Sequence, residues 1–195
     1  KLQDAGKNLK LPNLNLGGPQ RGGGGGLIYK GTGRVMNAKD EGPDTRNYAS
    51  GKPSDVTHEW NVINCPFDAY EFDADVTIGK IDHDDTISMK MYGPKHDDGN
   101  RAWYIADITF KGGKFQGGYE DPHPNGDYSC INGGSIGSIV GKTTHVKSVI
   151  WPLAGGGAHL EFYANGQKLY SGNNPCGKKY KRHPNQQVQL RIDAA

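Results

Sequence analysis

The sequence predicts an all-β fold, a two-sheet antiparallel sandwich of the jelly-roll type. Apolar and polar residues alternate in several short runs, turn residues are abundant, and no run carries a convincing helical period. Of the 195 residues, 30 are Gly and 11 are Pro while 34% are hydrophobic, which favours many turns around a thin core.

Three runs show the alternation most clearly: Val56–Ile63, Glu71–Ile78 and Thr86–Tyr92. Such a period of two is typical of half-buried antiparallel strands. In the third run, the alternation predicts one face with Ile87, Met89 and Met91 and the opposite face with Ser88, Lys90 and Tyr92.

The remaining predicted strands are Trp103–Phe110, His145–Trp151, Ala158–Tyr163 and Gln187–Ile192. Asn165-Gly166 follows the third of them and predicts a hairpin, because both residues tolerate the positive φ of a type I′ turn. A run of five glycines at Gly22–Gly26 indicates a flexible segment over residues 1–26, packed on or leading into a β-jelly-roll domain over residues 27–195.

Charge and hydropathy exclude two classes of partner. The formal net charge is +2, too balanced for the concentrated basic face of a nucleic-acid-binding protein. No apolar stretch approaches the ~20 residues of a membrane helix. The densest basic run, Lys178–His183, is interpreted as a solvated loop in preference to a patch for an anionic polymer.

The three cysteines predict one disulfide and one free thiol. Cys130 and Cys176 both occur in loop-like sequence, where a bridge would tie two loops together, whereas Cys65 ends a strand-like run. We therefore expect Cys130 to pair with Cys176 and Cys65 to remain a buried thiol. Zinc binding is not expected, because zinc sites favour closely spaced pairs.

Two segments rich in Asp and His, Asp82–Asp85 and His96–Asn100, invite a metal interpretation. The second is more typical of a polar turn, and neither meets the twelve-residue calcium-loop pattern. We expect no organic cofactor and no catalytic metal. The carboxylates of the two segments leave the binding of a structural calcium ion as an open alternative.

Three other segments carry charged or polar residues where a buried strand would not: Thr57–Asn61, Gly79–His83 and Gln189–Asp193. In order and spacing they resemble the polysaccharide lyases of family 7 and the related glucuronan lyases, enzymes with an alginate-lyase-like (concanavalin-like) β-jelly roll. The resemblance spans residues 55 to 193. It departs from the family pattern at several positions, because Thr57, Lys80 and Asp82 replace its first arginine, its glutamine and its histidine.

The resemblance implies β-elimination on a uronate polysaccharide of the glucuronan or alginate type. Such a reaction needs a group that neutralises the C6 carboxylate, a base for the C5 proton and an acid for the departing glycosidic oxygen. The catalytic candidates are Lys80 and Asn61 for the carboxylate and Tyr92, His58 or His83 for proton transfer. The substrate-binding candidates are Glu59, Trp60, Asp82, His83, Lys90 and Arg191.

Two alternatives stay open. A carbohydrate-binding module or lectin would use Trp60, Trp103, Tyr92 and Tyr104 for stacking on sugars, and a glycoside hydrolase would use Glu59 with Asp82 or Glu71. His58 is either a catalytic residue or part of the core, because its neighbours Val56, Trp60 and Val62 favour a packed core face. In each case we expect a secreted, extracellular monomer that binds an anionic polysaccharide, and a chain beginning at Lys1 is compatible with a signal peptide already removed.

Overall fold

The computed structural model describes residues 19–21, 27–29, 39–44, 57–62, 65, 67–79, 84–93, 102–121, 126–184 and 186–192. Up to residue 62, only the backbone of the strands is described. The strands are β1 (Pro19–Arg21), β2 (Leu27–Tyr29), β3 (Lys39–Asp44), β4 (Thr57–Val62), β5 (Tyr70–Thr77), β6 (Thr86–Gly93), β7 (Trp103–Thr109), β8 (Lys114–Glu120), β9 (Gly126–Ser135), β10 (Thr143–Pro152), β11 (Ala158–Ala164), β12 (Gln167–Asn173) and β13 (Gln187–Ile192).

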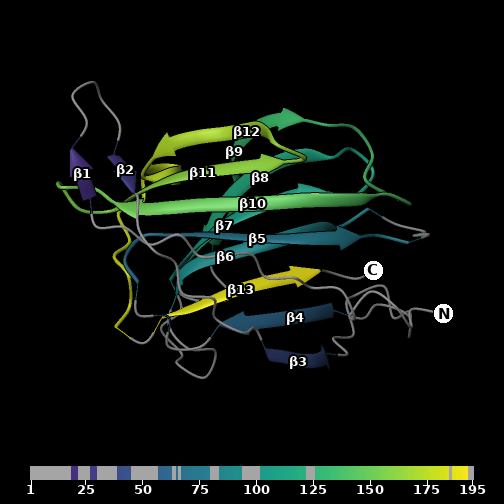
Figure 1. The fold of residues 1–195 in the computed structure, drawn as a ribbon, viewed down its shortest axis with the longest axis horizontal. Coiled ribbons are helices and arrows are strands. Elements are labelled where there is room, and N and C mark those ends of the chain that lie inside the picture. Colours follow the sequence, from purple (N-terminus) through teal and green to yellow (C-terminus); the bar gives the residue numbers. More distant parts are fainter. Residues whose placement is uncertain are drawn as a thin grey trace.

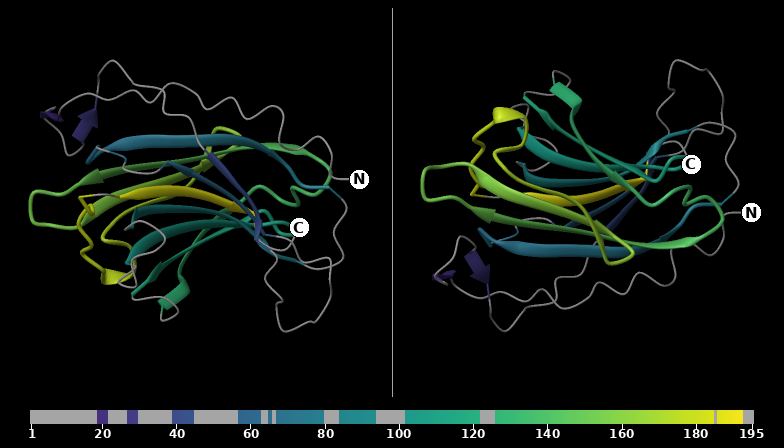
Figure 2. Two further views of the ribbon diagram at one scale, coloured as in Figure 1. Left: turned by 90° about the horizontal axis from the view of Figure 1, so that it is seen from below. Right: turned by 90° about the horizontal axis from the view of Figure 1, so that it is seen from above.

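These strands form two large antiparallel sheets, so the predicted fold class is confirmed. One sheet has seven strands in the order β3-β4-β13-β6-β7-β8-β9, and the other has four in the order β12-β11-β10-β5 (Figure 1). Seen edge-on, the two sheets stack as two layers (Figure 2). Among the described residues the only helical element is a single 3₁₀ turn, Pro175–Gly177. The described residues therefore contain no helix that is long and apolar enough to cross a membrane.

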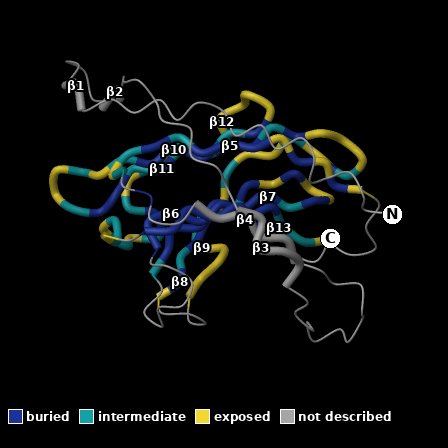
Figure 3. The backbone as a smooth tube through the Cα atoms, turned by 60° about the horizontal axis from the view of Figure 1, so that its bottom comes forward, coloured by how far each residue is buried: buried dark blue, intermediate teal, exposed yellow. Residues whose placement is uncertain are grey.

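The core lies between the two large sheets and takes alternate residues from their strands. In β10, every second residue from Thr144 to Ile150 is buried, and β11 repeats the pattern from Ala158 to Ala164. The layers meet at Phe115 of β8 and Phe162 of β11, whose ring centroids are 5.1 Å apart. Buried segments follow β5, β6, β7 and β10 through the interior (Figure 3).

Five strands were not predicted: β1, β2, β3, β8 and β9. The segments of β8 and β9 contain Gly117, Gly118, Gly133 and Gly134, and glycine has a low strand propensity. Strand β9 pairs with β8 through two register shifts and is the last strand of its sheet. The expectation that Cys130 lies in a loop is therefore wrong, because Cys130 is a residue of β9.

The alternation predicted for β6 fails at its end. Ile87, Met89 and Met91 enter the core as predicted, but Tyr92 also does so instead of sharing a face with Lys90. Tyr92 has φ 67°. In the pairing of β6 with β13, the three-residue step from Lys90 to Gly93 on β6 is matched by a step of only two residues on β13. This β-bulge inserts one residue and turns the Tyr92 side chain to the opposite face.

The five-glycine run lies between two short paired strands. Pro19 of β1 is opposite Tyr29 of β2, and Arg21 is opposite Leu27. The segment predicted to be flexible, residues 1–26, thus contains one strand of a small antiparallel sheet, and its five-glycine run lies outside the described residues.

The disulfide prediction is confirmed. Cys130 and Cys176 are bonded with a Cα–Cα distance of 5.6 Å, and Cys65 is a free thiol with 1% exposure. Burial raises the pKa of that thiol. The bridge joins β9 to the 3₁₀ turn, two elements separated by 46 residues in the sequence.

Removing this bridge should destabilise the fold substantially. A closed loop of 46 residues restricts the unfolded chain by about 4 kcal/mol. We expect Cys176→Ser to lower the free energy of unfolding by ~2–4 kcal/mol in urea titrations. Reductant should lower the stability of the parent protein to a similar extent and leave that of Cys176→Ser unchanged. Equal stability of parent and variant would contradict a stabilising role.

Candidate functional site

The seven-stranded sheet carries polar residues on the surface turned away from the core. We call this surface the polar face and define it by six buried side chains: Ser88, Lys90, Asp107, Glu120, Gln189 and Arg191. They come from β6, β7, β8 and β13 and alternate with core residues on those strands. Polar groups are buried at a free-energy penalty unless they are paired, so six together on one face mark an organised site.

Strand register arranges this face in rows. Arg191 lies opposite Ser88, and Ser88 lies opposite Asp107. In the next row, Gln189 lies opposite Lys90. Directly opposite residues of an antiparallel pair share a face, so these side chains are neighbours although they are up to 103 positions apart in the sequence.

The rows extend to β4 by backbone register. Glu59 is opposite Arg191, and Asn61 is opposite Gln189. The two intervening positions of β4 differ, because His58 is opposite Ile192 and Trp60 is opposite Leu190, two residues of the core.

On the polar face, beside the last strand of the sheet, a tyrosine, a carboxylate and a lysine form a cluster. Lys90 Nζ donates to Glu120 Oε1 at 3.1 Å, and the hydroxyl of Tyr128 donates to the same oxygen at 3.1 Å. Lys90 Nζ also lies 5.9 Å from the ring centroid of Trp103. Lys90 and Glu120 are buried, whereas Tyr128 is 38% exposed. The phenol is therefore the accessible member of this cluster.

Gly118 allows β9 to approach closely enough for this contact. A Cβ atom at that position would lie 2.2 Å from the carbonyl oxygen of Asp127 and 2.5 Å from Cα of Tyr128. Neither backbone atom could move aside without breaking the pairing of β8 with β9. The absence of a side chain at Gly118 thus positions Tyr128 against Glu120.

The environment of Tyr128 keeps its hydroxyl protonated. Desolvation of the phenol, followed by the charge and the hydrogen bond of Glu120, raises the pKa of Tyr128 to about 12. The positive charge of Arg191 lowers the pKa of Tyr128, and the negative charge of Asp107 raises it. At neutral pH the phenol is a proton donor and not a base.

Of the residues predicted for the site, the structure places Lys90 and Arg191 on the polar face and sets Glu59 and Asn61 in register with it. Lys80, Asp82 and His83 lie outside the described residues, as do the side chains of His58 and Trp60. The strand that leads to Lys80 is β5, which belongs to the four-stranded sheet and not to the sheet of the polar face.

Tyr92 does not belong to this cluster. It is 1% exposed, its amide donates to the hydroxyl of Tyr70 at 3.3 Å, and its own hydroxyl donates to the carbonyl oxygen of Asp68. Because of the bulge described above, it lies on the core side of β6, away from Lys90.

Glu120, Tyr128, Asp107 and Gln189 were missed by the sequence analysis. Asp107 and Gln189 interrupt apolar neighbours inside two predicted strands, and that interruption is a usable signal. Glu120 and Tyr128 lie in strands that were themselves missed, so no pattern in the sequence connects them.

The four-stranded sheet holds a second cluster of the same residue types. On its outer surface, Glu161 accepts hydrogen bonds from the hydroxyl of Tyr163 at 2.5 Å and from Lys168 Nζ at 2.8 Å. Desolvation alone would raise the pKa of Glu161, but hydrogen bonds from Lys168 and Tyr163 lower it overall. Lys168 is exposed, unlike Lys90. We use this second cluster as a matched control for the first.

No metal centre is evident in the part of the chain that the structure describes: it contains no group of three or more His, Cys, Asp or Glu side chains that could hold an ion. Of the two Asp/His-rich segments, Asp82–Asp85 lies half outside that part and His96–Asn100 wholly outside it. Calcium binding therefore remains a prediction.

Comparison with known proteins assigns no family to the chain, since no family model and no curated protein match it. Among solved structures, it is similar to alginate lyase Aly36B, with a TM-score of 0.29 and 11% identity over 73% of this chain and 72% of the other. A variant of that lyase in complex with alginate trisaccharide gives a TM-score of 0.30 and 14% identity over 83% of each chain. Similarity at this level carries no information about function.

Proposed function

We propose that the protein is a polysaccharide lyase that cleaves a uronate polymer by β-elimination on the polar face. One observation carries this proposal: an accessible tyrosine donates its hydrogen bond to a buried Lys90–Glu120 pair on that face. Amide and hydroxyl groups of Gln189 and Ser88 surround it, and such groups suit the hydroxyls of a sugar.

The residues divide into two roles. Tyr128, protonated at neutral pH, gives its proton to the departing glycosidic oxygen as an acid. Arg191 supplies positive charge for the C6 carboxylate, and Lys90, whose charge is balanced by Glu120, adds a hydrogen-bond donor, with Asn61 and Glu59 on the adjoining strand as further binding groups. The base for the C5 proton is assigned to His83, because Tyr92 lies in the core and His58 is opposite a core residue.

A glycoside hydrolase is less well supported. The two described carboxylates of the polar face are Asp107 and Glu120, and Glu120 is opposite Trp103, four positions from Asp107 along β7. Four residues of a strand span about 13 Å. The two carboxyl groups of glycosidases are ~5–9.5 Å apart, whereas the backbone positions of this pair are farther apart than that.

The proposal is tested by the products formed from a panel of polyuronates, including glucuronan and alginate. A lyase creates an unsaturated uronate with new ultraviolet absorbance, a hydrolase creates reducing ends without it, and a binding module creates neither. We expect new absorbance on at least one polymer. Binding without either product would support the carbohydrate-binding alternative and reject the lyase.

Lys80 provides a second test, based on the resemblance to family 7. If Lys80 neutralises the carboxylate, Lys80→Ala should lose ~10²–10³ in kcat while its melting temperature stays close to that of the parent. An exposed lysine at the end of a strand would change the free energy of unfolding by less than about 0.5 kcal/mol. Near-normal turnover of the variant would leave the carboxylate to Lys90 and Arg191 alone.

A further inference from the structure

A pocket of about 390 Å³ is lined by residues none of which is among the six that define the polar face. Its walls come from four segments: Asp68 before β5, Tyr92 at the end of β6, the β10–β11 turn from Pro152 to Gly157, and the pair Lys181 and Arg182 before β13. Small-molecule sites occupy ~300–1,000 Å³, so the volume suits one sugar unit.

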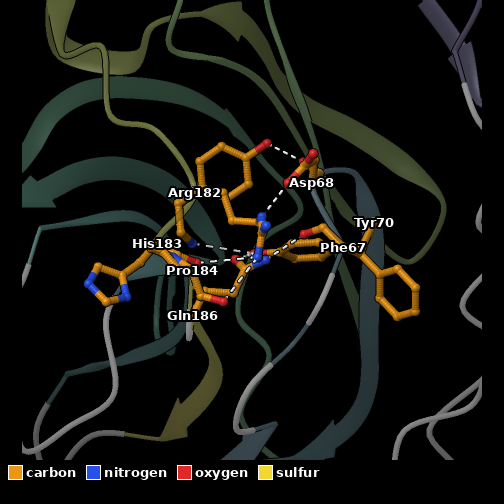
Figure 4. A network of polar contacts seen from close by, with 8 residues as sticks. Phe67, Asp68, Tyr70, Arg182, His183, Pro184 and Gln186 are labelled. Carbon is orange, nitrogen blue, oxygen red and sulfur yellow. Dashed lines mark hydrogen bonds and ion pairs between the residues drawn. The ribbon is translucent and has the colours of Figure 1, made fainter.

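A network of hydrogen bonds fixes the polar wall of this pocket (Figure 4). Arg182 forms an ion pair with Asp68 through Nε and donates from Nη1 to the carbonyl oxygens of His183 at 3.4 Å and Pro184 at 3.3 Å. Gln186 donates to the carbonyl oxygen of Phe67, and the hydroxyl of Tyr92 reaches the backbone of Asp68. The positions of Asp68 and Arg182 are therefore set before any ligand binds.

The opposite wall is a turn that also holds its own shape. Leu153 donates its amide to Gly157 at 3.1 Å, and Gly156 donates to Leu153 at 3.0 Å. Gly157 has φ 79°, and a Cβ there would lie 1.8 Å from Oδ1 of Asn174. Pro152, Leu153 and Ala154 present apolar surface to the pocket.

The pocket has a surplus positive charge. Arg182 neutralises Asp68, the one acidic side chain among the described lining residues. Lys181 is exposed and has no partner in the part of the chain that the structure describes, and Nη2 of Arg182 has no acceptor there either. Two donors with one unbalanced charge suit a ligand with a single negative charge and further oxygen atoms.

Strain at Tyr92 supports a ligand site. A bulky residue with φ near 67° is a backbone outlier that costs ~1–3 kcal/mol, and such strain is concentrated at functional sites. Tyr92 is 1% exposed, and it lines the pocket from the side of β6 that is turned away from the polar face.

We infer that this pocket is a second carbohydrate site, which binds one uronate unit through its carboxylate. Lys181 and Arg182 would pair with the carboxylate, and the apolar wall would contact the sugar ring. The choice of a uronate rests on the proposed function, whereas the pocket and its charge do not. A second site would hold the same polymer without taking part in the chemistry.

The test is direct binding of D-glucuronate, with no turnover involved, by isothermal titration calorimetry and NMR. We expect Lys181→Ala to weaken glucuronate binding about tenfold, because one charge-assisted contact contributes about 1.4 kcal/mol. Ala154→Trp, which fills the pocket, should abolish binding. Lys179→Ala is the matched control, since Lys179 is an exposed neighbouring lysine outside the pocket lining, and should bind normally.

Glucose and inorganic phosphate complete the design. Glucose lacks the carboxylate and should bind at least tenfold more weakly than glucuronate. Phosphate that binds as tightly as glucuronate would overturn the assignment to a uronate. Arg191→Met removes a cation that is assigned to the uronate carboxylate on the polar face, so retained binding in that variant places the ligand elsewhere. Binding that is lost in Arg191→Met and unaffected by Lys181→Ala and Ala154→Trp would reject the pocket as the site, whatever the polyuronate screen gives.

Discussion

Tyr128→Phe is expected to lose ~10²–10⁴ in kcat on the best polyuronate and to remain folded. The substitution removes one oxygen atom, the only accessible proton donor of the cluster that the structure shows. The aromatic ring stays in place, and Glu120 keeps its ion pair with Lys90. The loss of one hydrogen bond lowers stability by about 0.5–1.5 kcal/mol, so the fall in turnover would not reflect unfolding. The measurement is the rate of new ultraviolet absorbance at saturating polymer.

Tyr163→Phe is the matched control for this variant. Tyr163 also donates to a glutamate that a lysine contacts, but on the four-stranded sheet. The chemical change is the same in both variants, and only the face differs. We expect Tyr163→Phe to retain normal turnover. If Tyr128→Phe also retains it, Tyr128 is not the acid and the proposed mechanism fails at that step.

The raised pKa of Tyr128 adds a pH dependence to this expectation. The phenol binds its proton more tightly in the folded protein, with a pKa of about 12, than in the unfolded chain. The acid form is thus present throughout the neutral range and is lost only as pH rises towards the folded pKa. Any fall in kcat between pH 6 and 9 should therefore come from the titration of another group. The residual activity of Tyr128→Phe should show the same fall over that range.

Much of the fold follows from one physical signal in the sequence. Burial of alternate residues against a second layer creates a period of two, and it is strong in β10 and β11. Strands β8 and β9 lack that signal because their glycines give close backbone approach and little apolar burial, as Gly118 shows. Local alternation also cannot anticipate a bulge such as that at Tyr92, which depends on pairing with β13.

The site is less predictable than the fold, because sheet order assembles it. Lys90, Glu120 and Tyr128 meet only because β6, β7, β8 and β9 are adjacent, and Arg191 joins them because the last strand inserts beside β6. Lys90 and Arg191 could be nominated because each is a cation amid apolar neighbours. Nothing in the sequence shows that Glu120 is the partner of Lys90, 30 positions away.

The second large effect is expected on stability, from breaking the Lys90–Glu120 ion pair. Lys90→Met keeps most of the apolar stem of the lysine but leaves the buried Glu120 carboxylate without the Lys90 cation. Removing one partner of a buried pair typically costs ~3–5 kcal/mol, because the remaining charge is poorly compensated. We expect a loss of that size in the free energy of unfolding, measured in urea at neutral pH.

Two further variants show whether burial of the charge is the cause. Lys90→Met combined with Glu120→Gln removes both charges and should recover most of the lost stability, since a buried pair replaced as a unit is often close to neutral. Lys147→Met breaks the Lys147–Glu71 ion pair on the other sheet, which is 3.2 Å long but has side chains 27% and 39% exposed. Exposed pairs contribute about 0–1 kcal/mol, so this control should change stability little. The opposite outcome is that Lys90→Met proves no more destabilising than Lys147→Met. Water would then have to reach the Glu120 carboxylate, which would contradict the burial of that side chain in the structure.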